Sequence, residues 1–225
     1  MKRILILIIM INTLLFSKEI FSNYQIKNIK TAMEVGESII LPNGENIKLI
    51  LGTLNFLEGS AGQSSKNHYI IYKGKKIKII LGDLEDNMYN KRIFINYKGL
   101  KKRVRVQNIY KNVNFNKISL GDMQIQLRTA KRTIKQTPEL IHIKHLIHND
   151  NELIRALLHD KRLSYLIAGY YIKLCYIESQ KRFKNIPEKS YKHLLHAISR
   201  YNGGWNNERY LSQFRKKREQ VKQFL

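Results

Sequence analysis

Leu49-Ile50-Leu51-Gly52-Thr53-Leu54-Asn55-Phe56-Leu57-Glu58-Gly59-Ser60 is an apolar stretch with one acid near its end. At about 100° per residue, Glu58 falls on the helix face that also carries Leu51 and Leu54. The spacing therefore predicts a helix that holds a carboxyl group against a hydrophobic wall and ends at Gly59, open to a cleft. Desolvation raises the pKa of a glutamate and keeps it protonated near neutrality, as a general acid requires. The alternative is a glutamate at the helix end that turns toward solvent.

Two later segments favour the catalytic interpretation of Glu58. The first contains Met123-Gln124-Ile125 followed by Thr129-Ala130, and the second contains Tyr201-Asn202-Gly203-Gly204. Together with the acid they resemble the lytic transglycosylases of the goose-lysozyme-like superfamily (SLT domain). That family has a catalytic Glu at a helix end, then Gly-x-Met-Gln-Ile-x-x-x-Thr-Ala, then Ala-x-x-x-Tyr-Asn-x-Gly. A tyrosine often follows, and Tyr210 stands at that place.

This resemblance implies an α+β, mainly α fold: a lysozyme-like helical domain that cleaves peptidoglycan between N-acetylmuramic acid and N-acetylglucosamine. Glu58 would protonate the glycosidic oxygen, and the muramyl N-acetyl group would stabilise the cationic centre. Glu58 would then take the proton of the 6-hydroxyl, which closes a 1,6-anhydro ring. The resemblance also assigns substrate binding to six residues: Ser119, Met123, Gln124, Ile125, Tyr201 and Asn202. No cofactor is expected.

Two departures from the family pattern leave other functions open. The family commonly has Ser after the catalytic Glu, where this chain has Gly59, and an apolar residue before the Met-Gln pair, where it has Asp122. A hydrolytic lysozyme of the same fold would use Asp122 to position water, whereas a capping or electrostatic role for Asp122 suits the transglycosylase. A third hypothesis is a catalytically inactive, cationic wall-binding component of a secretion apparatus.

The N-terminus predicts export. Lys2-Arg3 precede an apolar run from Ile4 to Phe16, which spans only about 20 Å as a helix against a hydrocarbon core of ~30 Å. This pattern is typical of a signal peptide, here residues 1–22, with Ser17 or Ser22 before the cleavage site. No later stretch predicts a membrane span. We therefore expect a protein of a bacterial periplasm or cell wall.

Composition sets the remaining limits. The 225 residues can form one good core, and the net charge of +24 suits an anionic partner. Export argues against nucleic acid, so peptidoglycan strands are the expected partner, with a secretion or division complex as a further candidate. Cys175 is the only cysteine and is expected to pack as a small hydrophobe. His142, His145 and His148 have no Cys or acid that completes a ligand set, so no metal is expected.

The chain between the first two motifs has a period of two. Tyr69–Tyr72 and residues 76–80 flank Lys73-Gly74-Lys75, and two more β-rich runs flank Gly99. Since family members usually have a short loop here, residues 68–112 are predicted as a β-hairpin insertion within a domain of residues 23–225. After Thr129 the pattern predicts helices to the end, including a long one from Leu163 to Phe183.

Overall fold

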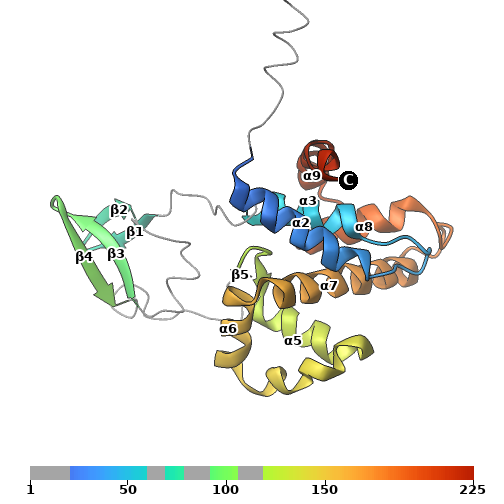
Figure 1. The fold of residues 1–225 in the computed structure, drawn as a ribbon, viewed down its shortest axis with the longest axis horizontal. Coiled ribbons are helices and arrows are strands. Elements are labelled where there is room, and N and C mark those ends of the chain that lie inside the picture. The colour runs from blue at the N-terminus through green and yellow to red at the C-terminus, as the bar shows by residue number, and fades with distance from the viewer. Residues whose placement is uncertain (1–20, 60–68, 79–91, 106–118) are drawn as a thin grey trace, which may run out of the picture.

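The computed structural model describes residues 21–59, 69–78, 92–105 and 119–225, which form a helical body and three two-stranded antiparallel sheets (Figure 1). The helices are α2 (Asn23–Glu37), α3 (Lys48–Gly59), α5 (Leu127–Gln136), the 3₁₀ segment η4 (Pro138–His148), α6 (Asp150–His159), α7 (Lys161–Arg182), α8 (Tyr191–Tyr201), α9 (Glu208–Val221) and the short η5 (Lys222–Phe224). The predicted mainly α class is confirmed.

Helix α3 runs through the middle of this body, in contact with α2, α7 and α9 (Figure 1). The predicted apolar face is confirmed, because Ile47, Leu51 and Leu54 are fully buried. Even the polar side chains Thr53 and Asn55 have no exposed area. A helix enclosed in this way brings its last turn, and with it Glu58, to an interior surface.

The predicted helices of the C-terminal half are present, with boundaries set by side-chain caps. Asn149 accepts a hydrogen bond from the backbone N–H of Glu152 and starts α6. Asp160 caps α7 in the same way, so this helix begins two residues before the predicted Leu163. Helix α8 starts at Tyr191 after its cap Ser190 and ends before Asn202. On α7, Cys175 is fully buried, and burial raises the pKa of its thiol to about 11.

The folded body begins earlier than one of the two predicted cleavage sites. Ser22 caps α2 in a reciprocal capping box with Gln25. The ring of Phe21 packs against Phe56 and Phe224, with centroid distances of 4.9 and 5.1 Å. The predicted hydrophobic segment itself lies outside the described residues. No helix in the described ranges is long and apolar enough to cross a membrane.

Both predicted hairpins are confirmed. Strand β1 (Tyr69–Tyr72) pairs with β2 (Lys75–Lys78), and β3 (Arg92–Tyr97) pairs with β4 (Leu100–Arg105). Each two-residue turn has positive φ at both positions, at Lys73-Gly74 and at Lys98-Gly99, as in a type I′ turn. Figure 1 shows these strands to one side of the helical body. The ends of the predicted insertion, His68 and Asn112, lie outside the described residues.

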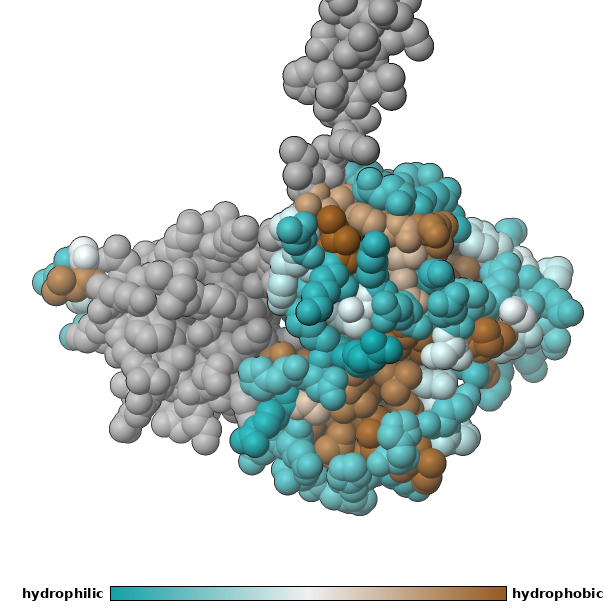
Figure 2. All heavy atoms as spheres, in the orientation of Figure 1, coloured by the Kyte–Doolittle hydropathy of each residue, from teal (hydrophilic) through white to brown (hydrophobic). Residues whose placement is uncertain are grey.

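Hydrophilic side chains cover much of the helical body on the face shown in Figure 2, and hydrophobic ones show between them near the top and in the lower half. The third sheet, β5 (Ser119–Leu120) with β6 (Ile125–Gln126), contacts α5 and α6, and its turn lies against Gly59 of α3. Its Leu120 and Ile125 belong to a buried cluster with α5, η4 and α6. Among the residues whose burial the structure describes, the buried clusters are formed by residues within 29–56 and 120–221.

Deleting residues 69–105 and joining the ends with a short Gly/Ser linker should leave a cooperatively folding helical protein. The reason is that this deletion removes no residue of those buried clusters. Far-UV circular dichroism followed through a thermal scan is the measurement. Loss of the cooperative transition would show that the hairpins belong to the core.

Candidate active site

Glu58 lies where two cavities meet. The larger, about 670 Å³, is bounded by the end of α3, the β5–β6 sheet, α5, α7 and the end of α8. The smaller, about 380 Å³, is bounded by the ends of α3 and α8 and by α9. Glu58 and Asn202 line both cavities. A chain-like ligand could therefore pass across the carboxyl group and extend on both sides of it.

The environment of Glu58 favours its protonated form. Burial raises the pKa of this carboxyl, and a hydrogen bond that the Tyr210 hydroxyl donates to Oε1 opposes that rise only in part. Burial and the nearby Glu58 in turn raise the pKa of Tyr210 and of Tyr201 well above the ordinary value. Both phenols thus remain neutral around the acid. Among the described residues that line the two cavities, Glu58 is the only carboxylic acid.

Gly59 allows the close approach of the β5–β6 turn to this acid. A Cβ on Gly59 would lie 2.4 Å from the carbonyl oxygen of Asp122, far inside contact distance. The turn is confined on its other side as well, because a Cβ on Gly121 would lie 2.3 Å from the carbonyl oxygen of Leu157. The glycine that departs from the family pattern is therefore required by packing between α3 and the turn.

The turn itself presents Gln124 to the larger cavity. Gln124 has a positive φ of 49°, and its backbone N–H donates to the Gly121 carbonyl at 3.0 Å. Its side-chain amide donates to the same carbonyl at 2.9 Å. Of the predicted substrate-binding residues, Ser119, Gln124, Ile125, Tyr201 and Asn202 line this cavity.

Met123 is the one predicted substrate-binding residue that lines neither cavity, and its expected role needs correction. Ile125 borders the larger cavity but is only 2 % exposed, because its side chain belongs to the buried cluster with α5, η4 and α6. The Met123 side chain is fully buried in the core, where the amide nitrogen of Asn55 contacts the sulfur at 3.9 Å. Only its backbone takes part in the site, since the Tyr201 hydroxyl donates to the Met123 carbonyl at 2.6 Å. The buried Met123 side chain therefore fixes the turn to the core, and the Tyr201 hydrogen bond connects the end of α8 to the same turn.

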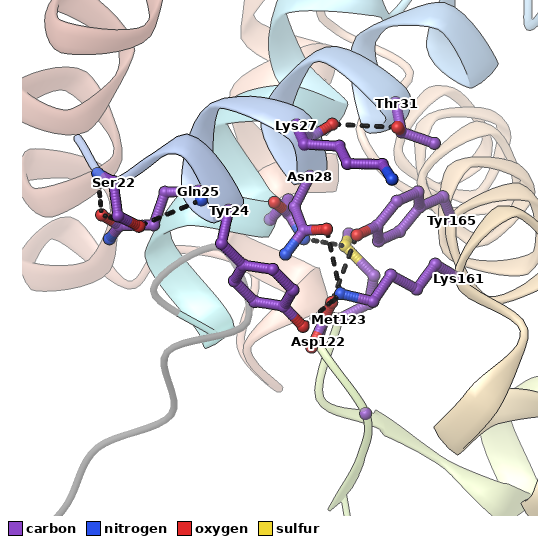
Figure 3. A network of polar contacts seen from close by, with 12 residues as sticks. Ser22, Tyr24, Gln25, Lys27, Asn28, Thr31, Asp122, Met123, Lys161 and Tyr165 are labelled. Carbon is purple, nitrogen blue, oxygen red and sulfur yellow. Dashed lines mark hydrogen bonds and ion pairs between the residues drawn. The ribbon is translucent and has the colours of Figure 1, made fainter.

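Asp122 belongs to a polar network that holds the turn against α2 and α7 (Figure 3). Its carboxylate pairs with Lys161 at 3.0 Å and accepts a hydrogen bond from the Tyr165 hydroxyl at 3.2 Å. The same ammonium group of Lys161 donates to the Tyr24 hydroxyl at 2.6 Å and to Asn28 Oδ1 at 2.9 Å. Asp122 is not among the residues that line the two cavities. These contacts suit the capping or electrostatic role rather than the positioning of water.

Asn202 both lines the cavities and fixes the loop after α8. Its side-chain oxygen accepts a hydrogen bond from Asn207 Nδ2 at 3.1 Å. The backbone N–H of Asn207 donates to Ser199 Oγ at 2.6 Å, and that hydroxyl donates to the Gly204 carbonyl at 2.8 Å. Asn207 also caps α9, the helix that carries Tyr210. The loop thereby sets the position of the hydrogen-bond donor to Glu58.

Several residues of the site were not assigned by the sequence. The hydroxyl of Tyr210 contacts Glu58, and the only signal for it is that the family which the motifs resemble often has a tyrosine at that place. Tyr171 lines the larger cavity and packs against Tyr201 with a centroid distance of 5.6 Å. Arg128, Arg132 and Arg200 also line it. The sequence offers no signal for the arginines, since basic residues are scattered through the whole chain.

No protein-family model, curated protein or solved structure matches this chain. The geometry of the site combines one buried acid, neutral tyrosines and a cleft open on both sides of the acid.

The Asp122 network predicts a stability difference. Asp122→Ala should lower the free energy of unfolding by about 2 kcal/mol, because it leaves the buried Tyr165 hydroxyl and Lys161 without their carboxylate partner. Chemical denaturation is the measurement. Glu34→Ala is the matched control, since Glu34 pairs with Arg162 on the surface and should change stability by no more than about 0.5 kcal/mol. Equal effects of the two substitutions would contradict this role for Asp122.

Proposed function

We propose that this chain is an exported peptidoglycan lytic transglycosylase of lysozyme-like fold, in which Glu58 is the general acid and then the base. The observation that carries the proposal is Glu58 itself, a buried carboxyl with a raised pKa at the junction of two cavities. The order and spacing of the three motifs support it further, because Gln124, Tyr201 and Asn202 lie around this acid.

A mechanism with a single carboxylate suits this site. Inverting glycosidases place a second carboxylate ~6.5–9.5 Å from the acid to activate water, and retaining ones use it as a nucleophile. No other acid of the described residues lines the cavities, and the carboxylate of Asp122 is bound by Lys161 and Tyr165. The substrate's own N-acetyl group and 6-hydroxyl supply the two functions that a second carboxylate would serve.

The proton moves twice in this scheme. The protonated Glu58 gives its proton to the glycosidic oxygen as the C1–O bond breaks, and the sugar on the other side leaves as an alcohol. The carboxylate that remains accepts the proton of the 6-hydroxyl while O6 bonds to C1, which restores the acid. Tyr210 donates a hydrogen bond to Oε1 of Glu58 and so orients the carboxyl and stabilises its anionic form between the two transfers.

Export fits the folded boundary best with cleavage at Ser17. Cleavage after Ser22 would remove the Phe21 ring from its contacts with Phe56 and Phe224 and the cap of α2. Cleavage at Ser17 would retain both. The partner of the exported protein is then the peptidoglycan strand, which the strongly cationic chain would meet in the cell wall.

Digestion of purified peptidoglycan, with mass spectrometry of the products, tests the function. We expect 1,6-anhydromuramyl products from the native protein and from Asp122→Asn, and at least a ~10²-fold lower rate from Glu58→Gln, which cannot transfer the proton. Glu34→Gln, on the surface, should behave as the native protein. Products that end in reducing muramic acid, lost in Asp122→Asn, would instead identify a hydrolase. Native turnover by Glu58→Gln would remove Glu58 from the mechanism.

The raised pKa of Glu58 also predicts how stability depends on pH. Because the folded state binds this proton more tightly than the unfolded state, the stabilisation is fully present below the ordinary pKa of 4.5 and is lost as pH rises through the folded value. Glu58→Gln carries no such proton, so its stability relative to the native protein should increase from pH 4 to pH 8. Thermal unfolding of both proteins across this range is the measurement. Parallel curves would show that Glu58 is not desolvated.

A further inference from the structure

Three arginines line the larger cavity. Arg128 and Arg132 enter it from α5, and Arg200 enters from the end of α8. Only Arg132 has an acidic partner among the described residues, because Glu178 of α7 forms an ion pair with it. The smaller cavity, on the other side of Glu58, has Arg209 alone. Positive charge is thus concentrated on one side of the acid.

Arg200 is held in place and retains an unused donor. Its Nη1 donates to the Gly203 carbonyl at 3.1 Å, and the guanidinium lies 5.5 Å from the ring centroid of Trp205. Its Nε is buried and has no hydrogen-bond partner in the described structure. The side chain of Arg200 lines the cavity, so its positive charge lies close to any ligand bound there.

Arg128 complements it from α5. This side chain is exposed, and its Nε donates to Gln126 Oε1 at 2.9 Å, which orients the guanidinium. Within the described part of the chain, the two terminal nitrogens of Arg128 remain for a ligand. The planar fork of an arginine matches the two oxygens of a carboxylate, whereas a neutral sugar hydroxyl uses it poorly.

We propose that the larger cavity has an arginine-lined arm, formed by Arg128 and Arg200, that binds a carboxylate carried on the 3-O-lactyl substituent of the muramic sugar. The protein would then select acidic glycan over neutral glycan. This inference rests on the proposed function and names the substrate group that the arm recognises. The carboxylate has two sources: the stem peptide attached to the lactyl group, or the lactyl acid itself on a strand without peptide.

Calorimetric titration of Glu58→Gln, which retains the cavity, separates these sources without turnover. Three soluble muramyl tetrasaccharides serve as probes: one with a lactyl carboxamide, one with a free lactyl carboxylate and one with a stem peptide. At least one acidic probe should bind about tenfold or more tightly than the neutral carboxamide, as one charge-assisted hydrogen bond implies. The tighter of the two acidic probes identifies the source.

The arginine variants then test the assignment to this arm. Arg128→Gln and Arg200→Gln, each in the Glu58→Gln background, should reduce the preference for the acidic probe toward one. Arg162→Gln, on a surface ion pair, should retain it. Arg128 is exposed, so its substitution should not disturb folding. Equal binding of acidic and neutral probes, or a preference unaffected by both variants, would overturn the inference. Failure of the native protein to cleave peptidoglycan would instead overturn the proposed function, since these titrations need no catalysis.

Discussion

The close packing of the α3 C-terminus against the β5–β6 turn is the contact on which the site depends. Gly59 has no side chain, so the Asp122 backbone can lie directly against it, and the next residue toward the N-terminus is the acid. Because α3 is enclosed by α2, α7 and α9, its last turn cannot move without disturbing the core. The turn is fixed independently by Lys161, Tyr165 and the buried Met123 side chain. Packing and polar contacts therefore hold both walls of the cleft at Glu58, as the proposed proton transfer over a short distance would require.

The chemistry around Glu58 depends on neutral partners. A carboxylate as neighbour would raise its pKa by repulsion, whereas an ammonium or guanidinium in contact would lower it and leave no proton to donate. The Tyr210 phenol carries no charge, since burial keeps its own pKa high. Its single hydrogen bond lowers the pKa of Glu58 by less than burial raises it. Tyr201 uses its hydroxyl for the Met123 carbonyl and presents its ring to the cavity. Desolvation can thus determine the protonation of the acid.

Charge in this protein acts on two scales. The net charge of +24 is spread over the whole chain and favours any anionic polymer without selecting one. The arginines of the cleft are different, because they come from two helices, converge on one side of the acid and include a buried donor without an acceptor in the described structure. Under the proposed carboxylate recognition, such an arrangement would select the position of an anionic group, which scattered surface lysines cannot do. The net charge of the chain and the arginines of the cleft would then both favour an anionic ligand.

The sequence alone determined the features that depend on local periodicity and turn chemistry: the α3 helix with its acid, the later helices, and the two hairpins. It also placed Gln124, Tyr201 and Asn202 as a set through motif spacing. Only the tertiary structure decided that Met123 faces the core, that Asp122 pairs with Lys161, and that Tyr210 reaches Glu58 from 152 positions away. The physical reason is that side-chain direction within one helix or strand is set by its own backbone, whereas contacts between distant segments depend on how closely the elements pack.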